Sequence, residues 1–119
     1  MVLGHGRLVV RLENKIMCEI STYNGGVRYG YNFILSSNYT FFSKMSVCKD
    51  FIEIKYPINN SIKIYINEIK IVFAMKFFFS KGIRIIHECN KYDPYLIFWT
   101  SQPREIILSL KDLGFPILE

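Results

Sequence analysis

The sequence has little of the side-chain chemistry on which most enzymes and cofactor proteins depend. Its 119 residues include only two histidines, three cysteines and seven glycines. Nucleophilic catalysis needs a cysteine or serine beside a base and an orienting group, and no glycine-framed nucleophile accompanies the two histidines. The glycines at 4–6 and 25–26 precede expected strands rather than helices, so no phosphate-binding loop is predicted. We therefore expect a protein that is not an enzyme and that binds no cofactor.

Disulfide bonds are not expected either. Cys18, Cys48 and Cys89 are odd in number and widely separated, whereas the disulfide framework of a secreted chain has an even set. Reduced and mostly buried thiols are the expectation.

Long hydrophobic runs are also absent. The longest, residues 69–79, is interrupted by Lys70 and Lys76, and it is shorter than the roughly 20 apolar residues of a membrane-spanning helix. Residues 1–12 contain Arg7 and Arg11 where a secretory signal has an apolar core. We expect a cytoplasmic protein, free or peripheral at a membrane.

Apolar residues are abundant and predict a folded domain. Half of the chain is apolar and 16% is aromatic, which is enough for a hydrophobic core in one domain of residues 1–119.

A spacing of two residues, typical of half-buried strands, dominates the chain. Apolar and polar side chains alternate over residues 52–56 and 62–67, on either side of a break rich in turn formers at 57–61, and this predicts a hairpin. A second hairpin is predicted upstream, with strands at 7–12 and 15–20 around Glu13-Asn14. Turns are predicted at 24–26, 80–82 and 90–94, and strands at 69–77, 83–86 and 95–100.

The C-terminus predicts one helix over about 102–113. Ser101 can cap its start and Pro103 suits its first turn. Ile106, Leu110 and their apolar neighbours share one face, and Gly114 supplies a left-handed stop. The predicted fold class is therefore mainly β: a barrel or sandwich of strongly bent antiparallel sheets, six to eight strands, capped by a C-terminal helix. Residues 1–36 are predicted to form a hairpin extension, and 37–119 the barrel.

Three segments in the second half of the chain resemble the bacterial pleckstrin-homology-like (PH-like) domains. Residues 41–54 look like their opening hairpin, and 62–69, ending in Asn67-Glu68-Ile69, look like the strand with a Ser/Asn-Glu-Ile step. Residues 82–103 look like the last hairpin running into the closing helix. The resemblance covers residues 41–117 or so.

The resemblance implies orthogonal sheets closed by a helix, and a binding or assembly module rather than an enzyme. Domains of this shape bind inositol phospholipids, peptides or other proteins, or assemble with copies of themselves. The phosphoinositide-binding members carry a basic Lys…Lys/Arg-x-Arg pattern across the first hairpin. This sequence has Lys44, Lys49 and Lys55 there, interleaved with Asp50 and Glu53, so no lipid-binding residue is carried over.

Metal-ligand chemistry is concentrated at His87 and Cys89. Alternate residues of a strand share a face, so both side chains could reach one ion. Zinc sites have three or four protein ligands, and the other histidine, His5, is distant in the sequence. We favour a structural role for His87 and Cys89. The alternative is a small metal-binding protein or enzyme centred on these two residues.

Basic residues are gathered in the stretch 63–84, where Glu68 is the sole acidic residue. Side by side, they would form a patch for anionic head groups; alternatively, they protect exposed strands from pairing and keep the chain soluble. The candidate anion-binding residues are Lys63, Lys70, Lys76, Lys81 and Arg84.

Phe77-Phe78-Phe79 is the candidate contact for a partner, because one member of a strand triplet points away from the other two. We single out Phe78, whose exposure would mark such a contact. The chain has only five arginines, and most of its aromatic residues fall on apolar faces. Neither observation favours a nucleic-acid partner. The first functional hypothesis is a non-catalytic interaction module that binds a protein or self-associates, and the alternative is a peripheral membrane module for anionic lipid.

Overall fold

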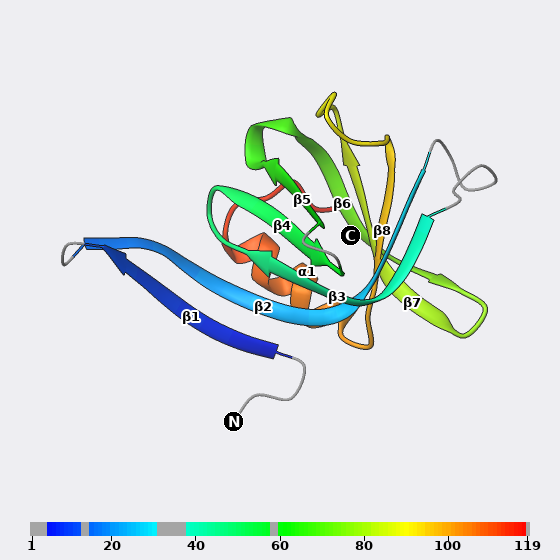
Figure 1. Ribbon diagram of the computed structural model, residues 1–119, viewed down its shortest axis with the longest axis horizontal. Helices are drawn as coiled ribbons and strands as arrows, with labels where there is room; N and C mark the ends of the chain where they lie inside the picture. Colours follow the sequence, from blue (N-terminus) through cyan, green and yellow to red (C-terminus); the bar gives the residue numbers. More distant parts are fainter. Residues whose placement is uncertain (1–4, 13–14, 31–37, 58–59, 119) are drawn as a thin grey trace.

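The computed structural model describes the backbone of residues 5–12, 15–30, 38–57 and 60–118, and the side chains of 20–30, 42–57 and 60–118. Seven antiparallel strands follow one another in a single sheet, in the order β5-β4-β3-β2-β8-β7-β6, and β1 pairs with β2 outside this path (Figure 1). The elements are β1 (His5–Leu12), β2 (Lys15–Gly30), β3 (Asn38–Val47), β4 (Phe51–Tyr56), β5 (Asn60–Tyr65), the 3₁₀ turn η1 (Ile66–Glu68), β6 (Ile69–Phe77), β7 (Ser80–His87), β8 (Tyr95–Trp99) and α1 (Pro103–Asp112). The predicted class, mainly β with one C-terminal helix, is confirmed.

The long strand β2 joins the two halves of the sheet. It pairs with β1 and β3 along its length, and Gly26–Gly30 also pair with β8. β2 therefore belongs both to the N-terminal hairpin and to the main sheet. Only the outer part of the β1–β2 hairpin projects from the body (Figure 1). The predicted hairpin turn at 13–14 lies outside the described residues.

Residues 24–26 do not form the predicted turn. They lie within β2, where the pairing register with β3 shifts between Gly25 and Val27. A Cβ atom at position 25 would lie 2.1 Å from the backbone oxygen of Trp99 and 2.7 Å from the ring of Phe98. The glycine therefore allows β2 to pass close to β8, and it does not reverse the chain.

The hairpin of β6 and β7 also turns earlier than predicted. Phe77 pairs with Ser80, so the turn consists of Phe78 and Phe79 rather than residues 80–82. Gly82 instead lies inside β7 opposite Trp99, where a Cβ atom would come within 2.6 Å of the Phe98 carbonyl oxygen. Gly25 and Gly82 both lie in predicted turns, and in the structure both allow close packing against the end of β8.

The helix α1 closes the interior of the curled sheet. Ile106 and Leu110 are fully buried in the core, and Ile107 and Leu113 pack against it, as predicted. Gly114 has the left-handed φ of 92°, and the N–H of Phe115 donates to the carbonyl of Leu110 across this stop. The predicted Ser101 cap is not formed. Instead, the hydroxyl of Thr100 accepts a hydrogen bond from the N–H of Gln102 at 3.1 Å.

A smaller apolar cluster lies on the other face of the sheet. Tyr95, Ile97 and Trp99 of β8 are buried there, with Met75 of β6 packed against them. Leu96 and Phe98 point into the main core, so β8 is buried on both faces. No helix of the described part is long and apolar enough to span a membrane.

Candidate docking site

His87 is held by backbone groups on both ring nitrogens. Its Nδ1 accepts a hydrogen bond from the N–H of Cys89 at 3.1 Å, and its Nε2 lies 3.0 Å from the carbonyl oxygen of Asp93. This pairing places the proton on Nε2. The ring is buried, and it fastens the loop between β7 and β8 to the end of β7.

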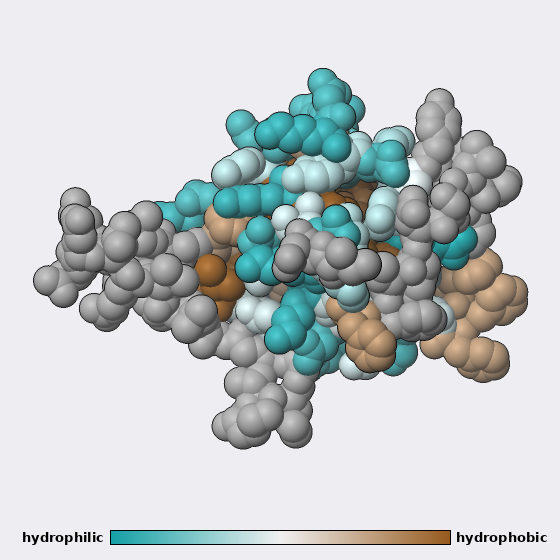
Figure 2. Space-filling view, in the orientation of Figure 1, coloured by the Kyte–Doolittle hydropathy of each residue, from teal (hydrophilic) through white to brown (hydrophobic). Residues whose placement is uncertain are grey.

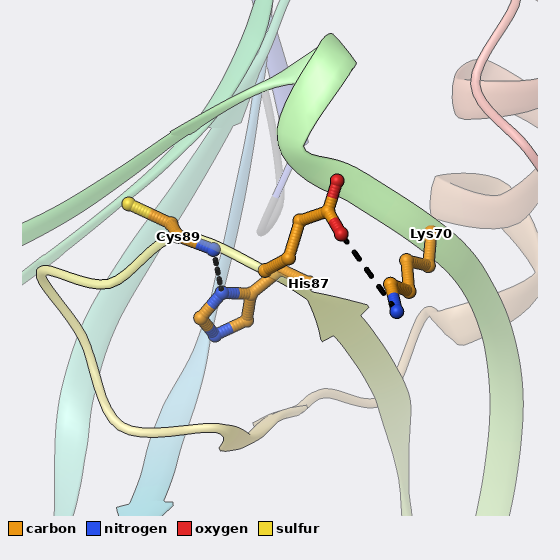
Figure 3. Close-up of polar contacts among 4 residues, drawn as sticks. Lys70, His87 and Cys89 are labelled. Carbon is orange, nitrogen blue, oxygen red and sulfur yellow. Dashed lines mark hydrogen bonds and ion pairs between the residues drawn. The ribbon is translucent and has the colours of Figure 1, made fainter.

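The thiol of Cys89 does not share a site with this imidazole. Figure 3 shows the sulfur directed away from the ring, while the Cys89 N–H points toward it. Among the described residues, no three histidine, cysteine, aspartate or glutamate side chains lie close enough to hold a metal ion. Cys48 and Cys89 are free and buried, and the side chains of His5 and Cys18 lie outside the described set. The geometry at His87 therefore supports the structural interpretation.

Three of the five candidate basic residues are engaged in contacts of their own. The Lys63 ammonium lies 4.2 Å from the ring centre of Phe51, and Lys70 pairs with Glu88 at 3.7 Å (Figure 3). The guanidinium of Arg84 lies 4.3 Å from the ring centre of Tyr95, a cation–π geometry.

Arg84 is packed into the smaller apolar cluster rather than presented to a ligand. Its Nε is buried and has no hydrogen-bond partner among the described groups. Burial raises the pKa of the Tyr95 hydroxyl, and the positive charges of Arg84 and Arg28 lower it in part. The two side chains thus belong to one packed cluster beside Ile97.

The structure brings together only Lys76 and Lys81 of the predicted five. They are direct partners across the β6–β7 hairpin, and both are exposed. Lys70 lies six residues earlier on β6, which is about 20 Å along an extended strand. The described strands therefore do not gather the five candidate basic residues into one patch.

Phenylalanine side chains cover the tip of the same hairpin. Phe77 is 41% exposed, Phe78 76% and Phe79 98%. The rings of Phe77 and Phe78 meet edge to face, with centroids 4.5 Å apart. Figure 2 shows them as a pale brown group at the right of the molecule, over the end of the hairpin that Figure 1 shows projecting there. Phe78 is thus exposed, which is the condition set above for a contact residue, and its two neighbours share this exposure.

The backbone at Phe78 is in an unusual conformation. Its φ is +54°, in the left-handed region, whereas a two-residue hairpin turn normally has glycine or asparagine at such a position. A side chain there costs about 1–2 kcal/mol relative to the usual right-handed conformation. The tip therefore carries an exposed ring at a position where backbone geometry favours no side chain.

A groove next to the tip extends the aromatic surface. It has a volume of about 730 Å³ and runs between Phe79 and Phe42 of β3, which is 87% exposed. Lys44 and Lys81 line it on the two sides, with Trp99 between them in the wall. None of the described residues that line the groove is an aspartate or glutamate. We call Phe42, Phe77, Phe78 and Phe79, together with Lys44, Lys76 and Lys81, the aromatic end.

Sequence reasoning identified only part of this end. Phe78, Lys76 and Lys81 were candidates, but Phe42 and Lys44 were not, because their position beside the hairpin depends on the pairing of β2 with β3 and β8. The triplet of phenylalanines in the sequence indicates a candidate contact. The sequence pattern does not show that Phe78 and Phe79 form a turn rather than part of a strand.

A tyrosine cluster lies elsewhere, around a groove of about 200 Å³ between Tyr29, Tyr56 and Tyr92. The rings of Tyr29 and Tyr56 are 5.6 Å apart. Burial, followed by the hydrogen bond with Tyr29, raises the pKa of Tyr56 to about 12. The hydroxyl of Tyr92 accepts a hydrogen bond from the backbone N–H of Lys63, so this cluster ties the loop after β7 to the edge of β5.

Comparison with known proteins gives no match. No family model fits the sequence, and no curated protein and no solved structure is significantly similar to it. The functional conclusion therefore depends on the geometry described above.

Proposed function

We propose that this chain is a non-catalytic interaction module with a PH-like fold, and that it docks on its partner through the aromatic end. The observation that carries the proposal is the exposure of four phenylalanines, Phe42 and Phe77–Phe79, at one end of the sheet. Clustered exposed aromatic rings of this kind are typical of contact sites, whereas scattered single apolar residues are ordinary surface.

Two features of the fold support the PH-like assignment. The strand order, with β2 between β3 and β8 and a helix after the last strand, agrees with the bent sheets and closing helix that the resemblance implies. The Asn67-Glu68-Ile69 step lies in and just after η1, where the Glu68 carboxylate accepts a hydrogen bond from the N–H of Tyr65 at 3.2 Å.

Docking through the aromatic end is better supported than pairing of strand edges. At β5, the N–H of Lys63 is bonded to Tyr92, and at β6 the Val72 backbone is bonded to Pro116 and Leu118. Both ends of the sheet path are thus partly occupied by the chain itself, which hinders the addition of another strand. Self-association, as first hypothesised, would then also use the aromatic rings.

Photo-crosslinking tests the proposal. Phe78 or Phe42 is replaced by p-benzoylphenylalanine in the full chain in cells, and Leu108 on α1, which is 52% exposed, is replaced in the same way as a control. We expect positions 42 and 78 to give the same identified adduct, whether lipid, another protein or a second copy, and position 108 not to give it. The proposal fails if positions 42 and 78 give no adduct, or if position 108 gives the same one.

A further inference from the structure

We infer that the partner of the aromatic end is an anionic membrane surface, into which Phe78 and Phe79 insert while Lys76 and Lys81 contact lipid phosphates. The inference depends on the proposed function, because it names the partner of that same docking site. Its first support is shape. Two strongly exposed rings, those of Phe78 and Phe79, lie on the two-residue turn of a projecting hairpin, a convex tip (Figures 1 and 2).

The position of the lysines along the hairpin matches the layering of a bilayer surface. Lys76 and Lys81 lie two residues back from Phe78 and Phe79 on the two paired strands, a distance of about 7 Å at the rise of a β-strand. Interfacial elements bury their apolar face about 5–10 Å into the boundary between head groups and acyl chains. Rings inserted to that depth place both ammonium groups among the phosphates.

Charge at this end is of one sign. Lys76 and Lys81 are exposed and form no ion pair with another described residue, and Lys44 lies across the groove. The basic residues engaged in aromatic or ion-pair contacts lie farther from the tip: Lys70 and Arg84 farther back on β6 and β7, and Lys63 on β5. An anionic surface approached by the hairpin tip therefore meets lysines and phenylalanines together.

A vesicle-binding titration with the full chain provides the test. Trp99 is the single tryptophan of the chain, and it lines the groove beside the tip, so its fluorescence reports binding and its quenching by brominated lipid reports depth. Vesicles of phosphatidylcholine alone are compared with vesicles that also contain phosphatidylserine. Each is measured at about 20 mM and about 500 mM salt, where the screening length falls from about 20 Å to about 4 Å.

Matched variants separate insertion from general attraction. K76Q/K81Q removes two charges at the tip, and K49Q/K91Q removes two exposed charges elsewhere. Lys91 lines another groove together with Glu68, the last residue of η1. Each lysine near an anionic surface strengthens binding about fivefold, so we expect K76Q/K81Q to bind about 30-fold more weakly and K49Q/K91Q to stay within about fivefold of the wild type. F78S/F79S, which leaves the core untouched, should bind at least about tenfold more weakly.

The expected result is salt-sensitive binding to phosphatidylserine vesicles, lost in the two tip variants. The inference is overturned if the wild-type chain does not bind those vesicles at low salt, if F78S/F79S binds like the wild type, or if K49Q/K91Q loses as much affinity as K76Q/K81Q. Failure on vesicles combined with one protein adduct at positions 42 and 78 would reject the membrane and keep the docking site. Failure of both experiments would reject both proposals.

Discussion

The backbone N–H of Cys89 donates a hydrogen bond to Nδ1 of His87, and the opposite nitrogen of the ring lies 3.0 Å from the carbonyl of Asp93. The imidazole thus links Cys89, near the start of the loop that connects β7 to β8, with Asp93, near its end. A residue pair that resembles two metal ligands in the sequence is, in the fold, a side chain that satisfies backbone groups.

Replacing His87 with alanine should lower the free energy of unfolding by about 2 kcal/mol, because the buried N–H of Cys89 and the part-buried carbonyl of Asp93 lose their partner. Urea denaturation of His87→Ala and the wild type would measure the difference. The same comparison with added zinc should show no change in the wild-type midpoint. A rise in that midpoint with zinc, abolished by His87→Ala, would contradict the structural role of this histidine.

Local patterns predicted the parts of the fold that depend on local chemistry. The alternation in 52–56 and 62–67 located β4 and β5 because each has one buried face. The helix is predictable because its apolar positions and the glycine that ends it lie within a short stretch of the sequence. The phenylalanine triplet predicts at least one ring that points away from its neighbours, but not the turn in which it lies.

Features that depend on distant segments were not predictable from the same patterns. Gly25 and Gly82 look like turn residues in the sequence, and their real constraint is the approach of Phe98 and Trp99 from a strand far along the chain. The groove between Phe42 and Phe79 arises from the same long-range pairing. The candidate basic residues are close in the sequence, but this does not make them close in space. Lys70 and Lys76, for example, lie near opposite ends of β6.

Gly25→Ala tests the close passage of β2 over β8. A methyl group at this position would overlap the backbone oxygen of Trp99, which cannot move as a flexible side chain can. We expect a loss of about 3 kcal/mol or more, at the upper end of overpacking substitutions. Gly114→Ala is the matched control. A Cβ atom at position 114 would contact nothing, but the backbone there has a φ of 92°. The substitution should therefore lower the free energy of unfolding by about 1 kcal/mol. Equal losses in the two variants, measured by urea denaturation, would argue against a steric role for Gly25.

Phe78→Gly should stabilise the domain while it weakens docking. The left-handed backbone at this position suits glycine, so we expect the free energy of unfolding to rise by about 1 kcal/mol. Binding to phosphatidylserine vesicles should fall, since an inserted ring is lost. Phe79→Gly is the comparison, because position 79 has no positive φ and should gain no stability. If Phe78→Gly is less stable than the wild type, the ring contributes packing at the tip that outweighs the backbone strain.

We expect the titration of Tyr56 to lower the stability of the domain at alkaline pH. Its pKa in the folded chain is about 12, whereas tyrosine in an unfolded chain has a pKa of about 10. Between these values the unfolded chain releases a proton that the folded chain retains, so the unfolded state is favoured as the pH rises. The contribution of Tyr56 is therefore complete below about pH 10 and is lost progressively as the pH rises through about 12.

Tyr56→Phe isolates this effect from the titration of the other tyrosines. We expect the free energy of unfolding of Tyr56→Phe to fall less steeply than that of the wild type between roughly pH 10 and pH 12, because phenylalanine has no proton to release. Urea denaturation across this range gives the slopes directly. Parallel curves for Tyr56→Phe and the wild type would show that the partly buried contact between Tyr56 and Tyr29 does not hold the Tyr56 proton in solution.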